Sequence, residues 1–218
     1  MYDYVLKRSA DAFMKVLLVN GSPHKNGSTY AALREVETAL NNEGIETSIV
    51  WLGTEAISGC LACGYCKKTG RCVTDDVVNK LAPDLLEADG IILASPVYYA
   101  APNGAFLAIL NRLFYSTHYD MSMKVGASIV AARRGGCTAS FDVLNKYFSI
   151  SGMPTVSSYY WDQIHGKSYE EAEEDLEGLD TMRSLGRNMA FLIKAIKDAK
   201  EKYTSPTRPN KVYTNFIR

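Results

Sequence analysis

The stretch that decides the fold covers residues 15–29 and reads KVLLVN–GSPHKNGST. Its first six residues form a continuous apolar run, which predicts a buried strand. A Gly-Ser-Pro turn at 21–23 ends that strand, and a helical pattern follows over 28–40. A strand, a loop rich in small polar residues and a helix in this order are typical of the first unit of an α/β fold.

Strand-like and helix-like stretches alternate along the rest of the chain. Because the strand-like runs are apolar throughout, they are typical of strands buried on both faces, in a parallel sheet that helices cover on both sides. Right-handed crossovers then give an open doubly wound sheet, so the expected fold class is α/β with five parallel strands. The expected strands are 15–20, 45–52, 90–95, 125–132 and 154–159, and the expected helices are 28–40, 75–87, 104–115, 141–150 and 180–202.

Composition and charge narrow the class of protein. The chain has 218 residues with 24 basic and 24 acidic side chains, which argues against nucleic acid or an anionic membrane as a partner. No apolar run approaches the roughly 20 residues that span a bilayer. The only apolar run near the N-terminus, at 16–19, is too short for a signal peptide. We therefore expect a cytoplasmic protein.

The sequence predicts one domain of 1–218 in four parts. Residues 14–165 form the ligand-binding core, preceded by an N-terminal extension at 1–13. Residues 166–203 form a C-terminal helical segment, and 204–218 a polar tail. The acidic run at 170–180 is interpreted as a solvated helix face or loop.

The loop after the first strand has the composition of an anion site. In an open α/β sheet the ligand crevice lies at the carboxyl ends of the strands, and the N-terminus of the following helix favours negative charge. The loop has neither the Walker pattern nor G-x-G-x-x-G, so a monophosphate fits it better than a triphosphate or a dinucleotide. The alternative is an ordinary turn in which Asn26 or Ser28 caps the helix.

Two further loops follow expected strands at the same edge. The loop at 95–102 reads SPVYYAAP, and its adjacent tyrosines offer aromatic faces and hydroxyls. The loop at 133–138 reads RRGGCT, where paired glycines let the backbone approach a planar ligand and an arginine can stabilise negative charge. The alternative for each tyrosine is packing in the core or at an interface.

Taken together, GSPHKNGST, SPVYYAAP and ARRGG resemble the flavodoxin-like NAD(P)H-dependent FMN reductases, and more closely their iron–sulfur flavoprotein branch. The resemblance covers Lys15 to about Trp161 and implies a five-stranded parallel sheet of order 2-1-3-4-5 that binds FMN. His24 departs from the pattern, since many relatives have arginine there; it either meets the phosphate or faces solvent. By carry-over, the phosphate would be held by Ser22, Asn26, Gly27, Ser28 and Thr29, and the isoalloxazine would meet Pro96, Val97, Tyr98, Tyr99, Arg134, Gly135 and Gly136.

Four of the five cysteines, Cys60, Cys63, Cys66 and Cys72, form a C-x2-C-x2-C-x5-C run. Three cysteines at steps of three can wrap one side of a cubane while the fourth closes it, and such a compact run is a poor zinc site. The run matches the motif of iron–sulfur flavoproteins, which implies a [4Fe–4S] cluster near the flavin. The alternative is reduced thiols that pack or respond to oxidants. Cys137 is interpreted as a small packing residue.

The resemblance implies that a hydride passes from NAD(P)H to FMN and that the electrons go on to an unidentified acceptor, directly or through the cluster. No catalytic acid or base is needed, and His118 and His165 are interpreted as surface or structural residues. One alternative is an electron carrier that ferredoxin reduces. A second is a non-enzymatic thiol or metal sensor without flavin.

The helix expected at 104–115 is more hydrophobic than one sheet face requires. We therefore expect a homodimer or tetramer that uses part of this helix as a subunit contact. The apolar residues behind this expectation are Phe106, Ile109, Leu110, Leu113 and Phe114.

Overall fold

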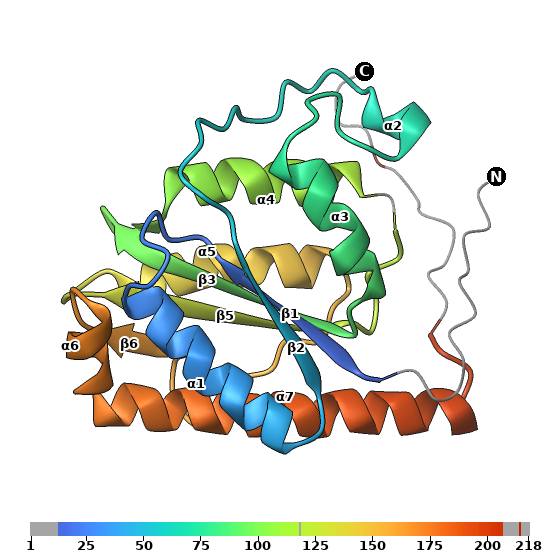
Figure 1. The fold of residues 1–218 in the computed structure, drawn as a ribbon. Coiled ribbons are helices and arrows are strands. Elements are labelled where there is room, and N and C mark those ends of the chain that lie inside the picture. The colour runs from blue at the N-terminus through green and yellow to red at the C-terminus, as the bar shows by residue number, and fades with distance from the viewer. Residues whose placement is uncertain (1–12, 118, 207–213, 215–218) are drawn as a thin grey trace.

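The computed structural model describes residues 13–117, 119–206 and 214. Its sheet has the order β2-β1-β3-β5-β6, with every one of these neighbours parallel, and a sixth short strand, β4, pairs antiparallel with β3. This is the doubly wound arrangement that the apolar strands predict (Figure 1). The strands are β1 (Lys15–Asn20), β2 (Glu46–Trp51), β3 (Gly90–Tyr98), β4 (Ala101–Pro102), β5 (Val125–Ala132) and β6 (Gln163–His165).

The prediction of the fifth parallel strand at 154–159 is wrong. In that stretch only Thr155 pairs with the sheet, through one isolated bridge to Gly126. The strand at the edge next to β5 is β6, which has a single fully buried apolar residue, Ile164. A three-residue strand between polar neighbours has no apolar run, so the search for such runs could not find it.

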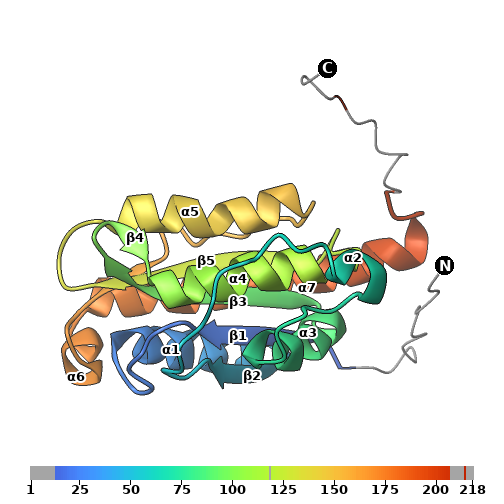
Figure 2. The same ribbon diagram turned by 90° about the horizontal axis from the view of Figure 1, so that it is seen from above.

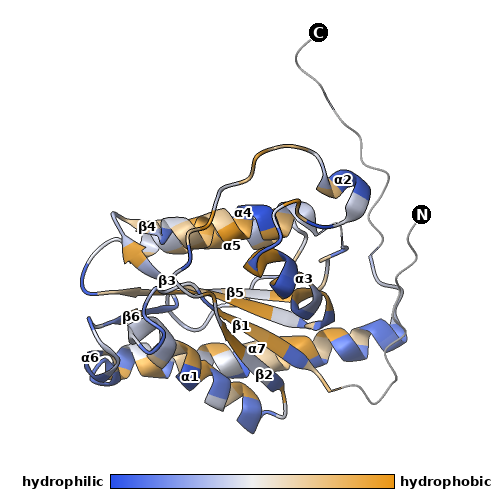
Figure 3. Ribbon diagram, turned by 45° about the horizontal axis from the view of Figure 1, so that its top comes forward, coloured by the Kyte–Doolittle hydropathy of each residue, from blue (hydrophilic) through white to orange (hydrophobic). Residues whose placement is uncertain are grey.

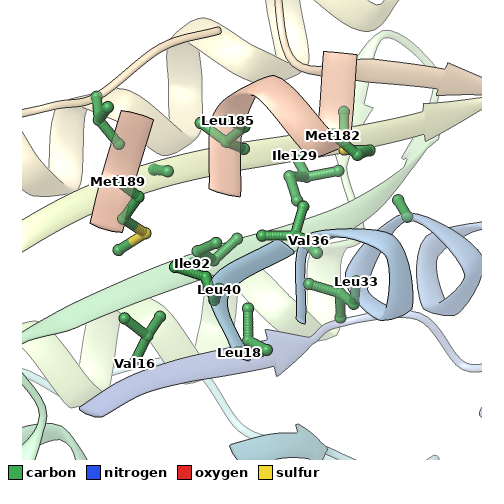
Figure 4. Packing of buried hydrophobic residues seen from close by; sticks show 14 of the residues in the cluster. Val16, Leu18, Leu33, Val36, Leu40, Ile92, Ile129, Met182, Leu185 and Met189 are labelled. Atoms are coloured by element: carbon green, nitrogen blue, oxygen red, sulfur yellow. The ribbon is translucent and has the colours of Figure 1, made fainter. Parts of the chain in front are cut away.

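Helices cover both faces of the sheet (Figures 1 and 2). On one face α1 and α7 pack together over β1, β3 and β5, and the buried side chains of this layer interlock in Figure 4. On the other face α3, α4 and α5 form the second apolar layer. The helices are α1 (Ser28–Asn42), α2 (Cys66–Thr69), α3 (Val77–Glu87), α4 (Gly104–Ser116), α5 (Cys137–Ile150), α6 (Tyr169–Glu173) and α7 (Leu176–Lys202).

Two helices begin earlier than periodicity predicts, because their first turns carry polar or small residues. Helix α5 begins at Cys137 instead of residue 141, directly after the left-handed Gly136. Helix α7 begins at Leu176 instead of 180, and the Asp175 side chain caps it by accepting from the Gly178 amide at 3.0 Å. The acidic run at 170–180 therefore contains α6 and the start of α7.

The five apolar residues of α4 behind the expected subunit contact lie in or against the core of this chain. Phe106, Ile109, Leu110 and Leu113 are buried in the second core layer, and Phe114 packs against it beside the ring of Tyr147. In Figure 3 much of this helix has the colour of hydrophobic residues, with a hydrophilic stretch nearer its end. The hydrophobicity of α4 is thus no evidence for a subunit contact. Among the residues described, no helix has the length and hydropathy of a membrane span.

The predicted extension and tail lie mostly outside the described part of the chain. Residues 1–12, 207–213 and 215–218 are not described, and neither is His118. The core begins with Met14, which packs partly buried against the α1–α7 layer.

Candidate flavin and cysteine sites

The loop between β1 and α1 (residues 21–27, the β1–α1 loop) is folded around the side chain of Asn20. Asn20 is fully buried; its Oδ1 accepts from the Ser22 amide at 3.0 Å, and its Nδ2 donates to the Lys25 carbonyl at 3.1 Å. The Ser22 hydroxyl in turn accepts from the His24 amide at 3.1 Å. These short-range bonds give the loop one defined backbone path. Sequence reasoning missed Asn20, although an Asn at a strand end before Gly-Ser-Pro is a turn-forming signal.

Gly21 lets this loop lie directly on α4. A Cβ at this position would be 2.4 Å from the ring of Phe106, so no side chain fits there. The Gly21 amide also donates to the Ala94 carbonyl of β3 at 2.8 Å. The β1–α1 loop is therefore fixed against the neighbouring strand whose end carries the two tyrosines.

The first turn of α1 has no side-chain cap. Gly27 is the N-cap residue, so the alternative in which Asn26 or Ser28 caps the helix is wrong. The first amides of a helix have no acceptor within it, and the helix dipole favours negative charge at that end. The turn at 27–29 is thus suited to receive an anion.

The predicted phosphate-binding residues do not all keep a free side chain. The Ser28 hydroxyl is directed away from the loop, toward the carbonyl oxygens of Gly166 at 2.8 Å and Ser168 at 3.1 Å. For Ser28 only the backbone amide is therefore available to an anion. Ser22 and Thr29 are buried at the loop, whereas His24 and Asn26 are exposed.

Trp51, at the end of β2, supports the loop from its other side. Its indole Nε1 donates to the Ser22 carbonyl at 2.9 Å, and the Lys25 ammonium lies 5.8 Å from the centre of its ring. A lysine over an indole is a favourable cation–π contact, and it places a positive charge beside the loop. Sequence reasoning assigned no role to either residue.

The loop after β3 is a tight hairpin. Val97 pairs with Pro102 and Tyr98 with Ala101, so Tyr99 and Ala100 form a two-residue turn with φ values of 52° and 57°. Left-handed backbone at two non-glycine residues is strained and persists where the surroundings enforce it. Tyr99 is fully exposed and Tyr98 is largely exposed, so packing in the core of the chain is excluded for both.

The loop after β5 touches this hairpin. Gly136 has φ 94°, and a Cβ there would lie 2.9 Å from the Ala100 Cα and 3.0 Å from a methyl carbon of Val97. Arg134 and Gly135 are exposed next to this contact. The ends of β1, β3 and β5 therefore come together at one edge of the sheet, at the left of Figure 1.

A pocket adjoins the β1–α1 loop, but its other walls come from segments that sequence reasoning did not single out. They are the stretch after β2 and the start of α4, and not the tyrosine hairpin. The lining residues are Gly21, Pro23, Leu52, Gly53, Thr54, Glu55, Ile57, Asn103, Ala105, Phe106 and Ile109.

The cysteine segment (residues 58–74) crosses over α4 and brings all four predicted ligands to one pocket. Cys60, Cys63, Cys66 and Cys72 line it, together with the end of α4. Cys60 and Cys63 are exposed, Cys72 is half-buried, and the Cys66 thiol is buried near the carbonyl of Tyr115. All four are free thiols, which is the form needed for thiolate ligation after loss of the proton.

In this structure the four thiols are not arranged around one common position for an ion. Within residues 13–117, 119–206 and 214, no three His, Cys, Asp or Glu side chains are arranged to hold a metal ion. The donor set fits an iron–sulfur cluster in two other respects. Four cysteines share one pocket, and a buried cation, Arg112, donates from Nε and Nη2 to the Cys72 sulfur at 3.3 Å each. Hydrogen bonding to Asp76 raises the pKa of Arg112.

The two candidate sites lie at opposite ends of α4 (Figures 1 and 2). The helix starts just after β4 at the tyrosine hairpin, and its end, at Tyr115 and Ser116, lines the cysteine pocket. At 1.5 Å per residue the 13-residue helix spans roughly 18 Å. A cluster and a flavin bound at these two candidate sites of one chain would thus be separated by about the length of this helix.

The structure agrees with the interpretation of two remaining residues, Cys137 and His165. Cys137 is buried in the second core layer, and burial raises the pKa of its thiol, as suits a packing residue. His165 has a structural place: its backbone amide donates to Asp175 Oδ2 at 2.7 Å, and its Nδ1 lies 3.5 Å from the same oxygen.

The arrangement of a parallel sheet with three polar loops at its carboxyl edge is that of a flavodoxin-like protein. An archaeal flavodoxin has this fold, with a TM-score of 0.58 over 83% of this chain and 99% of that one at 15% identity. The model of the NADPH-dependent FMN reductase family matches residues 14–166, and the chain belongs to that family.

Within the family the chain falls in the iron–sulfur flavoprotein branch. An iron–sulfur flavoprotein from Methanocaldococcus jannaschii is 32% identical over 192 residues, covering 84% of this chain and 100% of that protein. Another, from Methanosarcina thermophila, is 28% identical over 195 residues, covering 87% of this chain and 100% of that protein. The chain is thus a flavin-dependent oxidoreductase by family, and the family supports FMN as its cofactor.

Proposed function

We propose that this chain is an NAD(P)H-dependent flavin oxidoreductase that holds FMN at the carboxyl edge of its sheet and passes electrons to a small-molecule or protein acceptor. The observation that carries the proposal is the β1–α1 loop. It is folded on its own hydrogen bonds, it ends in a helix turn without a side-chain cap, and it lies beside the loops after β3 and β5.

The β1–α1 loop would bind the FMN phosphate through the charge of the α1 N-terminus and through hydroxyl and amide donors. The nearby Lys25 ammonium adds positive charge, and its contact with Trp51 limits where that charge can go. When bound, FMN supplies the hydride chemistry with the nicotinamide and the electron transfer onward. The phosphate would be held by Ser22, His24, Asn26, Gly27, Thr29 and the amide of Ser28.

The tyrosine hairpin and the loop after β5 would position the flavin ring. The tight turn at Tyr99 and Ala100 is braced by Gly136, so the ring would meet a preformed surface. The Arg134 side chain is exposed beside this surface and can stabilise negative charge on the ring. The residues of this surface are Pro96, Val97, Tyr98, Tyr99, Arg134, Gly135 and Gly136.

The four cysteines that line one pocket would hold a [4Fe–4S] cluster, which supplies single-electron transfer when bound. We further propose that the protein acts in the cytoplasm as a homodimer or tetramer.

A second candidate function is an electron carrier that a ferredoxin reduces. One observation favours it: exposed apolar side chains surround the exposed cysteines, namely Leu61, Tyr65 and Val73. Exposed apolar groups around a redox site are suited to docking a protein partner. A third candidate, a thiol or metal sensor without flavin, has only the free thiols in its favour.

The test is anaerobic purification followed by an absorbance spectrum and rapid mixing with NADH or NADPH. Bleaching of the flavin bands within seconds supports the oxidoreductase. Reduction only by a reduced ferredoxin contradicts it in favour of the carrier, and colourless protein that retains zinc favours the sensor. A broad shoulder that bleaches on reduction supports the cluster, whereas flavin bands alone, after reconstitution with iron and sulfide, contradict it.

A further inference from the structure

Arg112 is a buried charge on a helix that is otherwise apolar on its inner face. Its side chain is 1% exposed, and it lies on α4 beneath the cysteine segment. A guanidinium taken out of water is costly unless it is paired and its hydrogen-bonding groups are satisfied. Its partners therefore indicate why the fold keeps an arginine at this position.

The charge of Arg112 is balanced by Asp76. The contact is bidentate: Nη1 donates to Oδ2 at 2.7 Å and Nη2 to Oδ1 at 2.9 Å. Asp76 itself is fixed, since it caps α3 by accepting from the Val78 amide at 3.0 Å. The ion pair thus joins α4 to the start of α3, at the point where the cysteine segment ends.

The remaining donors of Arg112 reach both ends of the cysteine segment. Nη1 donates to the Ser58 carbonyl at 3.4 Å, two residues before Cys60, and Nη2 donates to the Thr74 carbonyl at 3.1 Å, two residues after Cys72. Nε and Nη2 donate to the Cys72 sulfur. One side chain therefore closes the segment into a loop and contacts one of its four thiols.

We infer that Arg112 is a positioning residue of the cysteine site: its planar fork ties Ser58, Thr74 and Cys72 together, and its charge favours the reduced form of an iron–sulfur cluster held there. Hydrogen bonds to cluster sulfurs and nearby positive charge raise the reduction potential, because the reduced cluster is more negative. The second half of this inference rests on the proposed function; the first half concerns the protein chain alone.

Substitutions of Arg112 can separate the role of its planar guanidinium group from the role of its positive charge. Lysine keeps the charge but cannot reach two carbonyls, a carboxylate and a sulfur at once. Methionine removes both, and would leave the Asp76 carboxylate without its partner. We therefore pair Arg112→Met with Asp76→Asn, which removes that carboxylate charge and retains a good helix cap. The double variant is compared with wild type in the first measurement and with Asp76→Asn alone in the second.

The first measurement uses the metal-free chain. Trypsin cleaves after Lys67, Lys68 and Arg71 within the segment, and cleavage of a folded segment tracks the population of its open form. We expect these cuts to be about tenfold faster in Arg112→Met/Asp76→Asn than in wild type, and nearly as fast in Arg112→Lys. A matched control is Arg183→Met, which breaks an ion pair with Glu35 on the opposite face and should leave these cuts unchanged. Equal rates in the double variant and in wild type overturn the positioning role.

The second measurement is an anaerobic redox titration of the reconstituted proteins, followed by electron paramagnetic resonance. At a fixed potential, we expect the ratio of reduced to oxidised cluster to be about tenfold lower in the double variant than in Asp76→Asn, which is 59 mV for one electron. Arg112→Lys should stay near the wild-type ratio. An unchanged ratio in the double variant overturns the role of the charge. If wild-type protein takes up no iron and sulfide, the proposed cluster is wrong, and the trypsin rates still decide the positioning role.

Discussion

The β1–α1 loop and the cysteine segment both follow a strand of the sheet, but they are held in opposite ways. The first is folded by a neighbour in sequence: Asn20 bonds to residues two and five positions away. The second is held by Arg112, which lies 38 to 54 residues from the groups of the segment that it contacts. A loop with local contacts keeps its shape as a unit with its strand and helix, whereas a clamped loop depends on a distant side chain. The two candidate sites should therefore respond to substitution independently.

The largest expected effect comes from removing a cysteine ligand. Cys66→Ser should reduce the iron and sulfide of the reconstituted protein to background, because the cluster loses its most buried ligand. FMN content should stay at the wild-type level, since the two sites lie at opposite ends of α4. Iron, sulfide and flavin analyses measure this. Cys137→Ser is the matched control and should keep its iron; loss of FMN from Cys66→Ser would break the independence of the two sites.

The next effect concerns the anion donors of the β1–α1 loop. Ser22→Ala with Thr29→Ala should weaken FMN binding by at least about 100-fold, since hydrogen bonds to charged groups contribute roughly 1.5–3 kcal/mol each. Fluorescence titration of the apoprotein measures the dissociation constant. Ser28→Ala is the control, because its hydroxyl binds the Gly166 and Ser168 carbonyls, so it should lower stability more than FMN affinity. Equal FMN affinities in the double variant and wild type would refute the assignment.

A smaller effect is expected on stability when one glycine of the β1–α1 loop and one glycine of the cysteine segment are each replaced by alanine. Gly21→Ala places a Cβ 2.4 Å from the Phe106 ring and should cost about 1–3 kcal/mol of unfolding free energy, as overpacking does. In Gly59→Ala, in the cysteine segment, the added Cβ has no atom within 4 Å. The unfolding free energy should therefore change by less than about 0.5 kcal/mol. Urea unfolding monitored by circular dichroism compares them. Similar costs for the two variants would mean that the β1–α1 loop is not packed as described.

A further effect is a pH dependence of stability that comes from Asp162. Asp162, just before β6, is fully buried, and burial raises its pKa from 3.8 to about 7, against hydrogen bonds from Ser158. Between about pH 4 and pH 7 the folded state therefore holds a proton that the unfolded state has lost. Stability should fall as the pH rises through this window, by at most about 1.4 kcal/mol per pH unit, and level off above it.

Thermal unfolding across that pH range measures the effect. Asp162→Asn, which keeps the shape without the charge, should flatten the slope. A slope that persists unchanged in Asp162→Asn would assign it to other groups.

Much of the fold was predictable because the three central strands, β1, β3 and β5, contain buried apolar runs, as at residues 90–94 of β3. The edge strand β6 was missed because one buried isoleucine makes no run. The three loops proposed to bind the flavin were singled out by small and polar residues at strand ends. Asn20 and Trp51 were missed because each looks like an ordinary strand terminus until its side-chain partners are known.

For the cysteine site, the sequence predicts the four cysteines but not the side chain that holds their segment in place. Its four proposed ligands can be identified from their spacing in the sequence, and they do line one pocket. Arg112 was hidden because it lies inside an apolar helical pattern, where a single arginine reads as a surface position. The separation from the flavin edge was hidden as well, because it depends on the path of the segment across α4.

The central claim is that the β1–α1 loop grips the phosphate of FMN, and a direct comparison of FMN with riboflavin tests it. Titration of the apoprotein by flavin fluorescence should give one FMN per chain and at least about 100-fold weaker binding of riboflavin, which lacks the phosphate. Equal affinity for the two flavins, or no FMN binding at millimolar concentration, would contradict the account.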